Sequence, residues 1–444
     1  MNRSAAPPPA ASSEARLVRA LGVWGLAASV VNVTVGGGIF RLPAEAARLL
    51  GPSAPWAYLV CALAMALIVL CFAAAGSRVS LTGGPYAYVE TAFGPFVGFL
   101  AGVLLWVVGT FALAAVSTLL ADALAALIPA LAGPVAKAAI LVAAYALLAG
   151  VNAGGVKQGA RLNSIATVAK LLPLLLLVAV GALAVRAENL VVAAPEAASV
   201  SRAAIVLIFA FAGIESALVP SGEVRDPART VPRAVLLAMV GITFLYLALH
   251  TVAQGVLGSD LAASTTPLAD AAGRVMGPGG RTLILVGTAV SIFGYVSGMM
   301  LAVPRALFAL ARDGFLPRPL ASVHPRFHTP HIAIAVQAVV TCALAISSQF
   351  LKLAVLANLA TLLLYAACCM AAWQLRRKRV ETGEGTPFRV PAEPLVPWLA
   401  LAAIAFLLTS ITLDEWLVMA GVLAGAALIF FVTSRSRAAR VGVA

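Results

Sequence analysis

A run of three glycines, Gly36 to Gly38, lies inside an apolar stretch that extends from about residue 18 to residue 47. Each glycine in a helix interior costs roughly 1 kcal/mol relative to alanine, so three in succession favour an interruption of the helix. In lipid, an interrupted helix leaves backbone N–H and C=O groups unpaired unless protein, water or a ligand covers them. The stretch therefore predicts a broken membrane helix whose break is a candidate binding site.

The chain is too apolar for a soluble domain. Of its 444 residues, 62% are hydrophobic and 11% are charged, whereas soluble domains have about 45–50% apolar and about 25% charged residues. Twelve apolar segments are long enough to span a bilayer: residues 18–47, 54–77, 94–124, 135–153, 162–185, 202–223, 234–257, 281–311, 331–347, 352–374, 395–412 and 416–434. The expected fold is an all-α membrane protein with twelve transmembrane helices.

The net charge of +13 is explained by membrane topology. With the N-terminus inside, 20 of the 30 Lys and Arg residues lie in cytoplasmic segments and 7 on the other side, and 3 lie within apolar segments. An excess of Lys and Arg in cytoplasmic loops is the usual signal of orientation, and it places both termini in the cytoplasm of a multi-pass protein in the cytoplasmic membrane. Contact with the lipid bilayer and its anionic headgroups accounts for the charge, so no nucleic-acid partner is expected.

No residue pattern in the sequence indicates a metal, a nucleotide or a catalytic centre. The five cysteines all lie in apolar segments without metal-ligand spacing, and buried free cysteines generally pack as small hydrophobic residues. His324, His328 and His331 share one loop but lack the acidic or cysteine partners of a zinc site. A phosphate-binding glycine loop with lysine is absent. We therefore expect no cofactor and no metal, and a transporter rather than an enzyme.

A second broken helix is predicted in the sixth apolar segment, which has Gly213 at its centre and Pro220 near its end. Breaks in the first and sixth segments correspond if residues 18–185 and 202–374 are two inverted five-helix repeats. Transporters of this design bind their substrate near the bilayer midplane, where the two broken helices meet.

The rest of the chain lies outside the two predicted repeats. Residues 395–434 are expected to form two accessory transmembrane helices, which serve packing or dimer contact, so a monomer and a homodimer both stay open. Residues 1–17 are expected to be a disordered cytoplasmic tail and residues 435–444 a second cytoplasmic tail.

Four motifs follow one another along the chain: Gly36-Gly37-Gly38-Ile39-Phe40-Arg41-Leu42-Pro43; Thr82-Gly83-Gly84-Pro85-Tyr86-Ala87-Tyr88; Phe211-Ala212-Gly213-Ile214-Glu215-Ser216 with the following Gly222 to Pro232; and Ala311-Arg312-Asp313-Gly314-Phe315-Leu316-Pro317. In their order and spacing they resemble the amino acid permeases of the amino acid–polyamine–organocation (APC) superfamily. The resemblance implies the inverted-repeat fold and amino acid transport by alternating access.

A free amino acid carries a carboxylate close to an ammonium, and the two breaks offer groups for both. The half-helix that begins after Gly38 presents N–H groups and a positive dipole end, which suit a carboxylate. Free carbonyls near Thr34 and Val35, and near Phe209 and Ala212, suit an ammonium. The alternative is that the glycines only allow close helix packing. The resemblance favours binding, and it assigns the substrate to Thr34, Val35, Gly36, Gly37, Gly38, Phe209, Ala212 and Gly213.

The expected pocket walls are mainly apolar. They include Val108, Thr110 and Leu113 in the third segment and Met299 in the eighth. A site for a cationic side chain normally contains a carboxylate or several amide and hydroxyl groups, so these walls favour neutral amino acids over arginine and polyamines. By the resemblance, Phe209 also matches the position of an aromatic gate over the substrate, with core packing as its alternative role.

Lys170 and Glu215 are candidates for coupling or gating. Lys170 lies eight residues into the fifth segment, about 12 Å from its cytoplasmic end at 1.5 Å per residue, where snorkelling is the alternative. Family members with a lysine at this position place its ammonium where sodium-coupled relatives bind Na⁺. Burial disfavours the charged form of lysine, so proton coupling follows, although some exchangers keep this lysine as a fixed cation, and Ser291 and Ser297 leave room for sodium.

Glu215 follows the second break directly. An acid at mid-membrane depth is costly and usually functional, so it is expected to hold a cationic substrate, to carry a proton, or to cap the second half-helix.

Taken together, these features predict a secondary active transporter that moves neutral L-amino acids by alternating access, coupled to H⁺ and independent of Na⁺. The alternative is an amino acid exchanger or an amino acid/amine antiporter.

Overall fold

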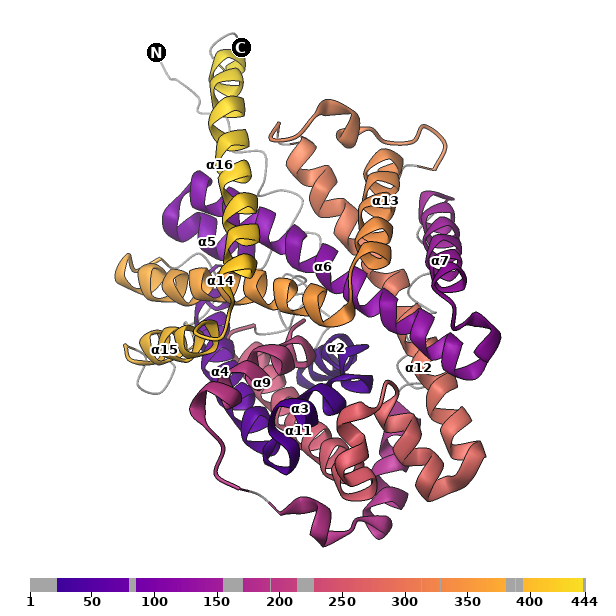
Figure 1. The fold of residues 1–444 in the computed structure, drawn as a ribbon. Coiled ribbons are helices and arrows are strands. Elements are labelled where there is room, and N and C mark those ends of the chain that lie inside the picture. The colour runs from indigo at the N-terminus through magenta and orange to yellow at the C-terminus, as the bar shows by residue number, and fades with distance from the viewer. Residues whose placement is uncertain are drawn as a thin grey trace, which may run out of the picture.

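The computed structural model describes residues 22–79, 85–154, 171–191, 193–213, 227–312, 314–327, 329–380, 388 and 394–441. Within these ranges every regular element is a helix (Figure 1). Seven helices are long and apolar enough to cross a membrane, and five shorter apolar helices accompany them. Together they follow the order of the twelve predicted segments, which confirms the predicted fold class of a multi-span helical membrane protein.

The main elements are α2 (Val23–Thr34), η1 (Gly38–Phe40), α3 (Leu42–Leu50), α4 (Pro55–Gly76), α5 (Pro85–Phe93), α6 (Pro95–Leu127), α7 (Pro134–Gly154), a helix over Leu171–Ala184, α9 (Ala197–Phe211), α11 (Pro227–Leu257), η7 (Gly258–Ala263), α12 (Pro267–Arg312), α13 (His331–Ser347), α14 (Phe350–Arg377), α15 (Val396–Leu408) and α16 (Leu413–Val441). Many of them begin at a proline, which has no N–H to leave unpaired in the first helical turn and a φ angle that already suits a helix.

The first apolar segment is broken at the glycines. α2 ends at Thr34, residues 35–37 form bends, and the chain resumes as η1 and then α3. Pro43 lies in the first turn of α3, so the second half-helix has its own start signal as well as a disrupted predecessor. The predicted interruption of the first helix is therefore confirmed.

The sixth apolar segment stops being helical at the predicted place. α9 ends at Phe211, Ala212 is extended, and Gly213 has a φ angle of 114°. This left-handed backbone region favours glycine because a Cβ atom would be strained there. The second half of the predicted segment, residues 214–223, lies outside the described residues.

Helices from segments that lie five places apart in the order of the twelve predicted segments pack against each other. α3 contacts α9, α4 contacts α11, α6 contacts α12, and α7 contacts α13. Such pairs are expected where two five-helix repeats are related by an axis between them. The repeat boundaries 18–185 and 202–374 and the tails stay predictions, since part of each lies outside the described residues.

Several short helical elements of the described residues lie outside the twelve segments. α12 starts at Pro267, in the loop between the seventh and eighth predicted segments, and turns at Gly277, where φ is 68°. α5 was not expected, and it packs against α6 and α14. Its motif contains Pro85, which is the first residue of the helix.

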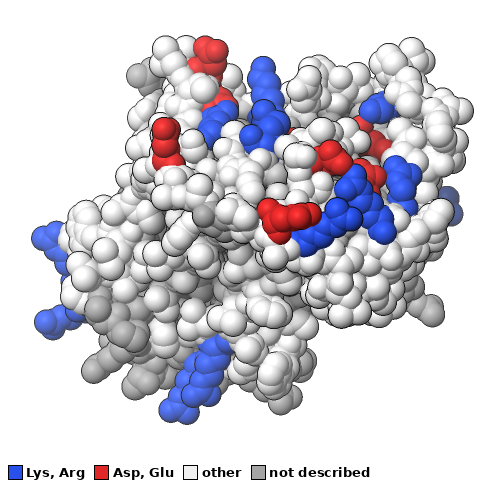
Figure 2. Space-filling view, turned by 60° about the horizontal axis from the view of Figure 1, so that its bottom comes forward, with Lys and Arg blue, Asp and Glu red and all other residues white. Residues whose placement is uncertain are grey.

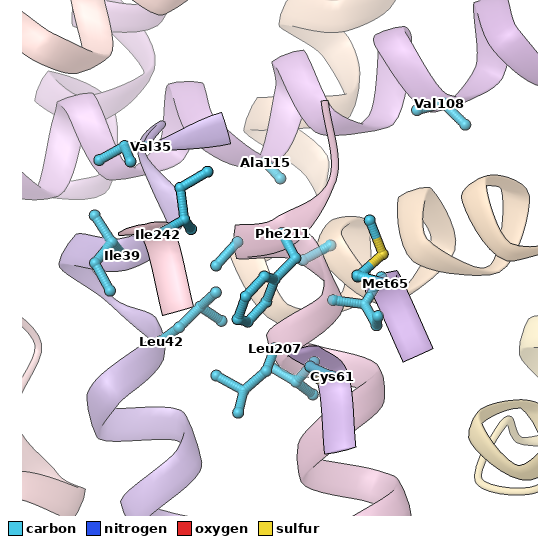
Figure 3. Close-up of a cluster of buried hydrophobic side chains, with 14 of the residues drawn as sticks. Val35, Ile39, Leu42, Cys61, Met65, Val108, Ala115, Leu207, Phe211 and Ile242 are labelled. Atoms are coloured by element: carbon cyan, nitrogen blue, oxygen red, sulfur yellow. The ribbon is translucent and has the colours of Figure 1, made fainter. Parts of the chain in front are cut away.

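An apolar cluster surrounds the end of α9 (Figure 3). Phe211 and Leu207 of α9 lie among Ile39 and Leu42 of the broken first helix and Ile242 of α11. These side chains are buried, so apolar packing, as well as polar contacts, fixes α9 relative to the second half of the first helix.

The helices differ strongly in how far the protein covers them. In the most apolar 18-residue stretch of α14, 78% is buried inside the protein, whereas the share is 17% in α7 and 11% in α16. α16 projects from the edge of the molecule in Figure 1, and exposed Leu428 and Phe431 lie along it. α14 is thus a central helix, and the apolar surfaces of α7 and α16 suit contact with lipid.

Charged side chains gather in bands on the face shown in Figure 2, with positive and negative residues side by side. The ion pairs of the described residues include Arg274–Asp260, Arg281–Asp270, Lys137–Asp122 and Arg202–Glu415. These residues lie at or near the ends of helices. Charges at such positions reach the boundary between lipid and water, where they are least costly.

The contact between Gly181 and Val252 gives a test of this packing. An added Cβ at Gly181 would overlap Cγ1 of Val252. We expect Gly181→Ala to lower the free energy of unfolding by about 1–3 kcal/mol, because overpacking a close-packed interior forces shifts. The double variant Gly181→Ala/Val252→Ala should regain part of that loss.

Thermal unfolding of the purified protein measures these effects. Gly150→Ala is the control, because no atom lies within 4 Å of its added Cβ. Equal unfolding temperatures for the Gly181 and Gly150 variants would contradict the packing described here.

Candidate functional site

A cavity of about 340 Å³ lies where the two interruptions meet α6, α12 and α14. Its volume falls in the range of small-molecule sites, about 300–1,000 Å³. The lining residues are Val33, Thr34, Gly36, Gly37, Gly38, Leu105, Trp106, Val108, Gly109, Ala112, Val116, Phe209, Ala212, Gly213, Tyr295, Met299, Ala302, Val303, Ala306, Ala357, Asn358 and Thr361. None of these residues carries a charge, so among the described residues the cavity is apolar with a few polar groups.

Most of the residues predicted to bind substrate line this cavity. They are Thr34, Gly36, Gly37, Gly38, Phe209, Ala212 and Gly213, together with the wall residues Val108 and Met299. Val35 does not line it, because its buried side chain belongs to the apolar cluster of Figure 3. The structure thus brings the two predicted breaks together around one space.

Thr110 and Leu113 do not line the cavity, in contrast to the expectation for the third segment. α6 turns its Leu105, Val108, Ala112 and Val116 face to the cavity, at the three- and four-residue spacing of a helix face. Thr110 points elsewhere, since its hydroxyl accepts a hydrogen bond from Gln337 Nε2 of α13 at 3.1 Å. Leu113 is fully buried in the core.

The two residues predicted for coupling or gating, Lys170 and Glu215, lie outside the described residues. Their roles stay predictions.

The N–H groups of Gly37 and Gly38 are available at the start of the second half-helix. No described carbonyl accepts a backbone hydrogen bond from either of them. An unpaired N–H at a helix start attracts anions, and the helix dipole adds to this attraction. Both glycines line the cavity, so these donors lie beside a space that a ligand can occupy.

The glycines also allow close packing, which was the alternative role. A Cβ atom at Gly37 would lie 2.6 Å from Val116 Cγ1, and one at Gly38 would lie 2.9 Å from Phe209 Cδ1. Gly36 is less crowded, with Tyr295 at 3.7 Å. At Gly37 and Gly38 the absence of a side chain therefore serves both the packing and the access of a ligand to the backbone.

Tyr246 of α11 joins the ends of the two half-helices. Its hydroxyl lies 3.1 Å from the carbonyl oxygen of Thr34 and 2.8 Å from that of Ala210. The single hydroxyl hydrogen donates to one of these oxygens at a time. The Thr34 carbonyl also accepts from the Gly36 N–H at 2.7 Å. From the sequence we expect this carbonyl to be free, and the structure shows that it is not.

The carbonyls of Val33 and Val35 accept no hydrogen bond from the described residues. They are among the last carbonyls of the first half-helix, which have no partner within the helix. A carbonyl oxygen is an acceptor that suits an ammonium group. Of the two residues only Val33 lines the cavity, so its carbonyl, rather than that of Thr34, is the acceptor available at the first break.

Sequence reasoning missed the contribution of α14 and α13 to the site. Asn358 of α14 is fully buried, and its Nδ2 donates to the carbonyl of Ile205 at 2.6 Å. Trp106 of α6 donates from Nε1 to Gln337 Oε1 at 2.8 Å. The available signal was the presence of Gln337 and Asn358 in otherwise apolar segments, since polar residues inside a membrane are rare and usually functional.

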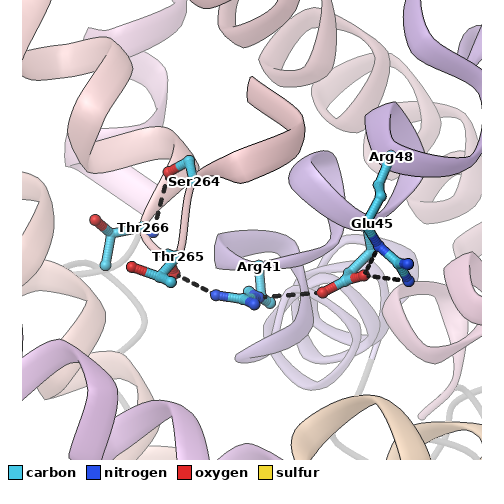
Figure 4. A network of polar contacts seen from close by, with 6 residues as sticks. All are labelled: Arg41, Glu45, Arg48, Ser264, Thr265 and Thr266. Carbon is cyan, nitrogen blue, oxygen red and sulfur yellow. Dashed lines mark hydrogen bonds and ion pairs between the residues drawn. The ribbon is translucent and has the colours of Figure 1, made fainter. Parts of the chain in front are cut away.

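A polar network holds the start of the second half-helix, which follows the break (Figure 4). Arg41 donates to the carbonyl of Thr265 at 2.9 Å and pairs with Glu45 at 3.3 Å. Glu45 also pairs with Arg48 at 3.1 Å. Through Thr265, the network ties α3 to the segment before α12.

We expect Tyr246→Phe to affect both stability and ligand binding. The loss of one hydroxyl should lower the free energy of unfolding by about 0.5–1.5 kcal/mol. Ligand affinity should also fall, because the ends of the two half-helices lose their shared donor. Thermal unfolding and equilibrium binding measure the two effects.

Tyr145→Phe is the matched control for this substitution. Its buried hydroxyl bonds with that of Ser117 at 2.7 Å, and neither residue lines the cavity. The control should lose similar stability but no affinity. If the two variants bind ligand equally well, Tyr246 does not position the site.

The sequence model of the family described as "Amino acid permease" matches residues 21–436. The chain is 28% identical to the methylthioribose transporter of Bacillus subtilis, over 96% of this chain and 95% of the relative. It is also 28% identical to the serine/threonine exchanger SteT of the same organism, over 87% and 89%. The branched-chain amino acid permease BcaP, again from B. subtilis, is 27% identical over 90% of each chain.

Proposed function

The chain belongs to the amino acid permease family of membrane transporters, and we propose that it carries neutral L-amino acids by alternating access, coupled to protons and independent of sodium. The observation that supports this function best is the cavity at the two interruptions. There, the N–H groups of Gly37 and Gly38 and the carbonyl of Val33, which have no backbone partner among the described residues, lie in an uncharged lining.

The backbone groups suit the part of the substrate that all amino acids share. The carboxylate is placed at the N–H groups of Gly37 and Gly38, where the half-helix dipole adds to the hydrogen bonds. The ammonium is placed at the carbonyl of Val33, a few residues earlier. Since these groups hold the common part, the side chains of α6, α12 and α14 are left to discriminate between substrates.

The neutral lining supports a substrate with an uncharged side chain. A buried charge without a partner is strongly unfavourable, and no described lining residue could pair with a cationic side chain. The names of the relatives point the same way, because serine, threonine and the branched-chain amino acids are all neutral. The name of a third relative, a methylthioribose transporter, makes that uncharged compound a necessary competitor in any substrate test.

Alternating access requires the half-helices to move relative to their surroundings. Phe209 lies against Gly38 and packs edge-on against Phe350, with ring centroids 5.6 Å apart. This position beside the cavity supports its proposed role as a gate. The contact of Arg41 with Thr265 ties the second half-helix to the segment before α12, and it must break or move with α3 when the gate opens.

Exchange is the alternative mode of transport, and the name of SteT favours keeping it. Counterflow distinguishes the two modes, because an obligatory exchanger moves labelled substrate only when substrate is present on both sides. For proton coupling the proposal depends on Lys170, by the family resemblance alone.

The proposed location is the cytoplasmic membrane, with both termini inside, on the basis of the excess of Lys and Arg in the predicted cytoplasmic segments. The exposed apolar surface of α16 is compatible with a monomer in lipid and with a homodimer.

Binding to a panel of compounds tests the substrate class. Purified protein should be stabilised thermally by serine, threonine, alanine, valine or leucine, since a ligand that binds only the folded state raises its stability. Arginine and agmatine should give no shift. A response to methylthioribose or agmatine with none to any neutral amino acid would contradict the proposed substrate class.

Reconstituted Lys170→Ala protein tests the coupling mechanism. In wild-type vesicles without sodium, an inward proton gradient should drive uptake above the equilibrium level, and the variant should lose this gradient-driven component while it still exchanges substrate. Lys137→Ala is the control, because Lys137 pairs with Asp122 outside the cavity. Unchanged gradient-driven uptake by the Lys170 variant would remove this residue from the mechanism.

A further inference from the structure

Two buried side-chain oxygens of the cavity lining have no hydrogen-bond partner among the described residues. They are Oδ1 of Asn358 and Oγ1 of Thr34. The residues are 0% and 2% exposed, respectively, and both line the cavity. A buried polar atom without a partner destabilises the folded state. A ligand that brings a hydrogen-bond donor to these oxygens would therefore recover free energy that the empty site lacks.

The orientation of the Asn358 amide follows from its one hydrogen bond. The backbone carbonyl of Ile205 can only accept, so the amide nitrogen must face it, at 2.6 Å. Ile205 belongs to α9 and does not line the cavity. The nitrogen is thus held toward α9, and the oxygen is the atom of the amide that is left without a described partner.

Two other polar groups of the lining, those of Trp106 and Thr361, cannot supply the missing donor. The Trp106 N–H is used by Gln337, and the Thr361 hydroxyl donates to the carbonyl of Ala357 at 2.8 Å. These groups have no hydrogen left to give to Asn358. Around Asn358 the lining therefore offers an acceptor, and the complementary ligand group is a donor such as a hydroxyl.

We propose that Asn358 is a specificity-determining residue that accepts a hydrogen bond from the side chain of the substrate, so that hydroxylated neutral amino acids bind better than apolar ones of the same shape. This inference rests on the proposed function, which places the carboxylate and ammonium at the backbone groups of the first break. Because the carboxylate and ammonium are held there, the Asn358 oxygen, which lies outside both breaks, can recognise the side chain of the substrate.

Threonine and valine are the appropriate pair of ligands, because they differ only by a hydroxyl in place of a methyl group. One net hydrogen bond contributes about 0.5–1.5 kcal/mol, which corresponds to about a 2- to 13-fold difference in affinity. Wild-type protein should bind threonine more tightly than valine by a factor in this range. In Asn358→Leu, a side chain of similar size without an acceptor, the ratio should fall to about one, mainly through weaker binding of threonine.

Valine binding shows that each variant is folded, because the proposed contact does not involve it. Asn152→Leu is the matched control: it removes a buried asparagine of α7 outside the cavity and should leave the ratio unchanged. If Asn358→Leu is not stable, Asn358→Ala removes the same acceptor without added bulk. Isothermal titration of the purified protein with each amino acid gives the ratios.

Three results would overturn the inference while leaving the proposed function in place: equal binding of threonine and valine by wild type, an unchanged ratio in the Asn358 variants, or an equal loss of both ligands. The last result would show that Asn358 contacts the carboxylate or ammonium of the substrate, or that it only stabilises the packing of the helices. Failure of wild-type protein to bind any neutral amino acid would instead contradict the proposed function itself.

Discussion

The membrane requires every backbone polar group to find a partner, and the whole site follows from how this chain meets that requirement at its two interruptions. In lipid, an unpaired N–H or C=O group costs several kcal/mol, so a broken helix is viable only inside protein. Here the break at residues 35–37 lies against α9, α11 and α6. Tyr246 is close to one carbonyl from each half-helix, while other groups face the cavity. The covered groups hold the structure, and the remaining ones are available to a ligand.

The arrangement divides the work between backbone and side chains. Gly37 and Gly38 are crowded by Val116 and Phe209, so their backbone positions are tightly defined before any ligand arrives. Preorganised donors of this kind lose little freedom on binding. The side chains around them are nearly all apolar, and the buried amide of Asn358 stands out as a group that discriminates by hydrogen bonding. A family can therefore keep one binding mode for amino acids and change its substrate through the helices that surround it.

The helix pattern and the break were predictable because both depend on local sequence. Long apolar runs fix the membrane helices, and the helical cost of Gly36 to Gly38 fixes the interruption. The positive φ angle at Gly213 likewise agrees with the break expected there. Phe209, Ala212 and the glycines were placed at the cavity by their position in two predicted breaks, which required only that the breaks meet.

The side-chain walls were harder to predict because they depend on the rotation of each helix about its axis. Thr110 and Leu113 lie within a few residues of Val108, but neither lines the cavity. The role of α14 depended on tertiary packing, since Asn358 reaches the site through its contact with α9. Val35 was misplaced for a similar reason: its backbone belongs to the break, but its side chain packs into the core.

A structure of the protein with a bound amino acid tests the central claim most directly. If backbone groups at the interruptions hold the substrate, the carboxylate oxygens should lie about 2.7–3.2 Å from the nitrogens of Gly37 and Gly38, with the ammonium toward the carbonyl of Val33. A carboxylate bound elsewhere, with residues 35–38 closed into a continuous helix, would contradict the account.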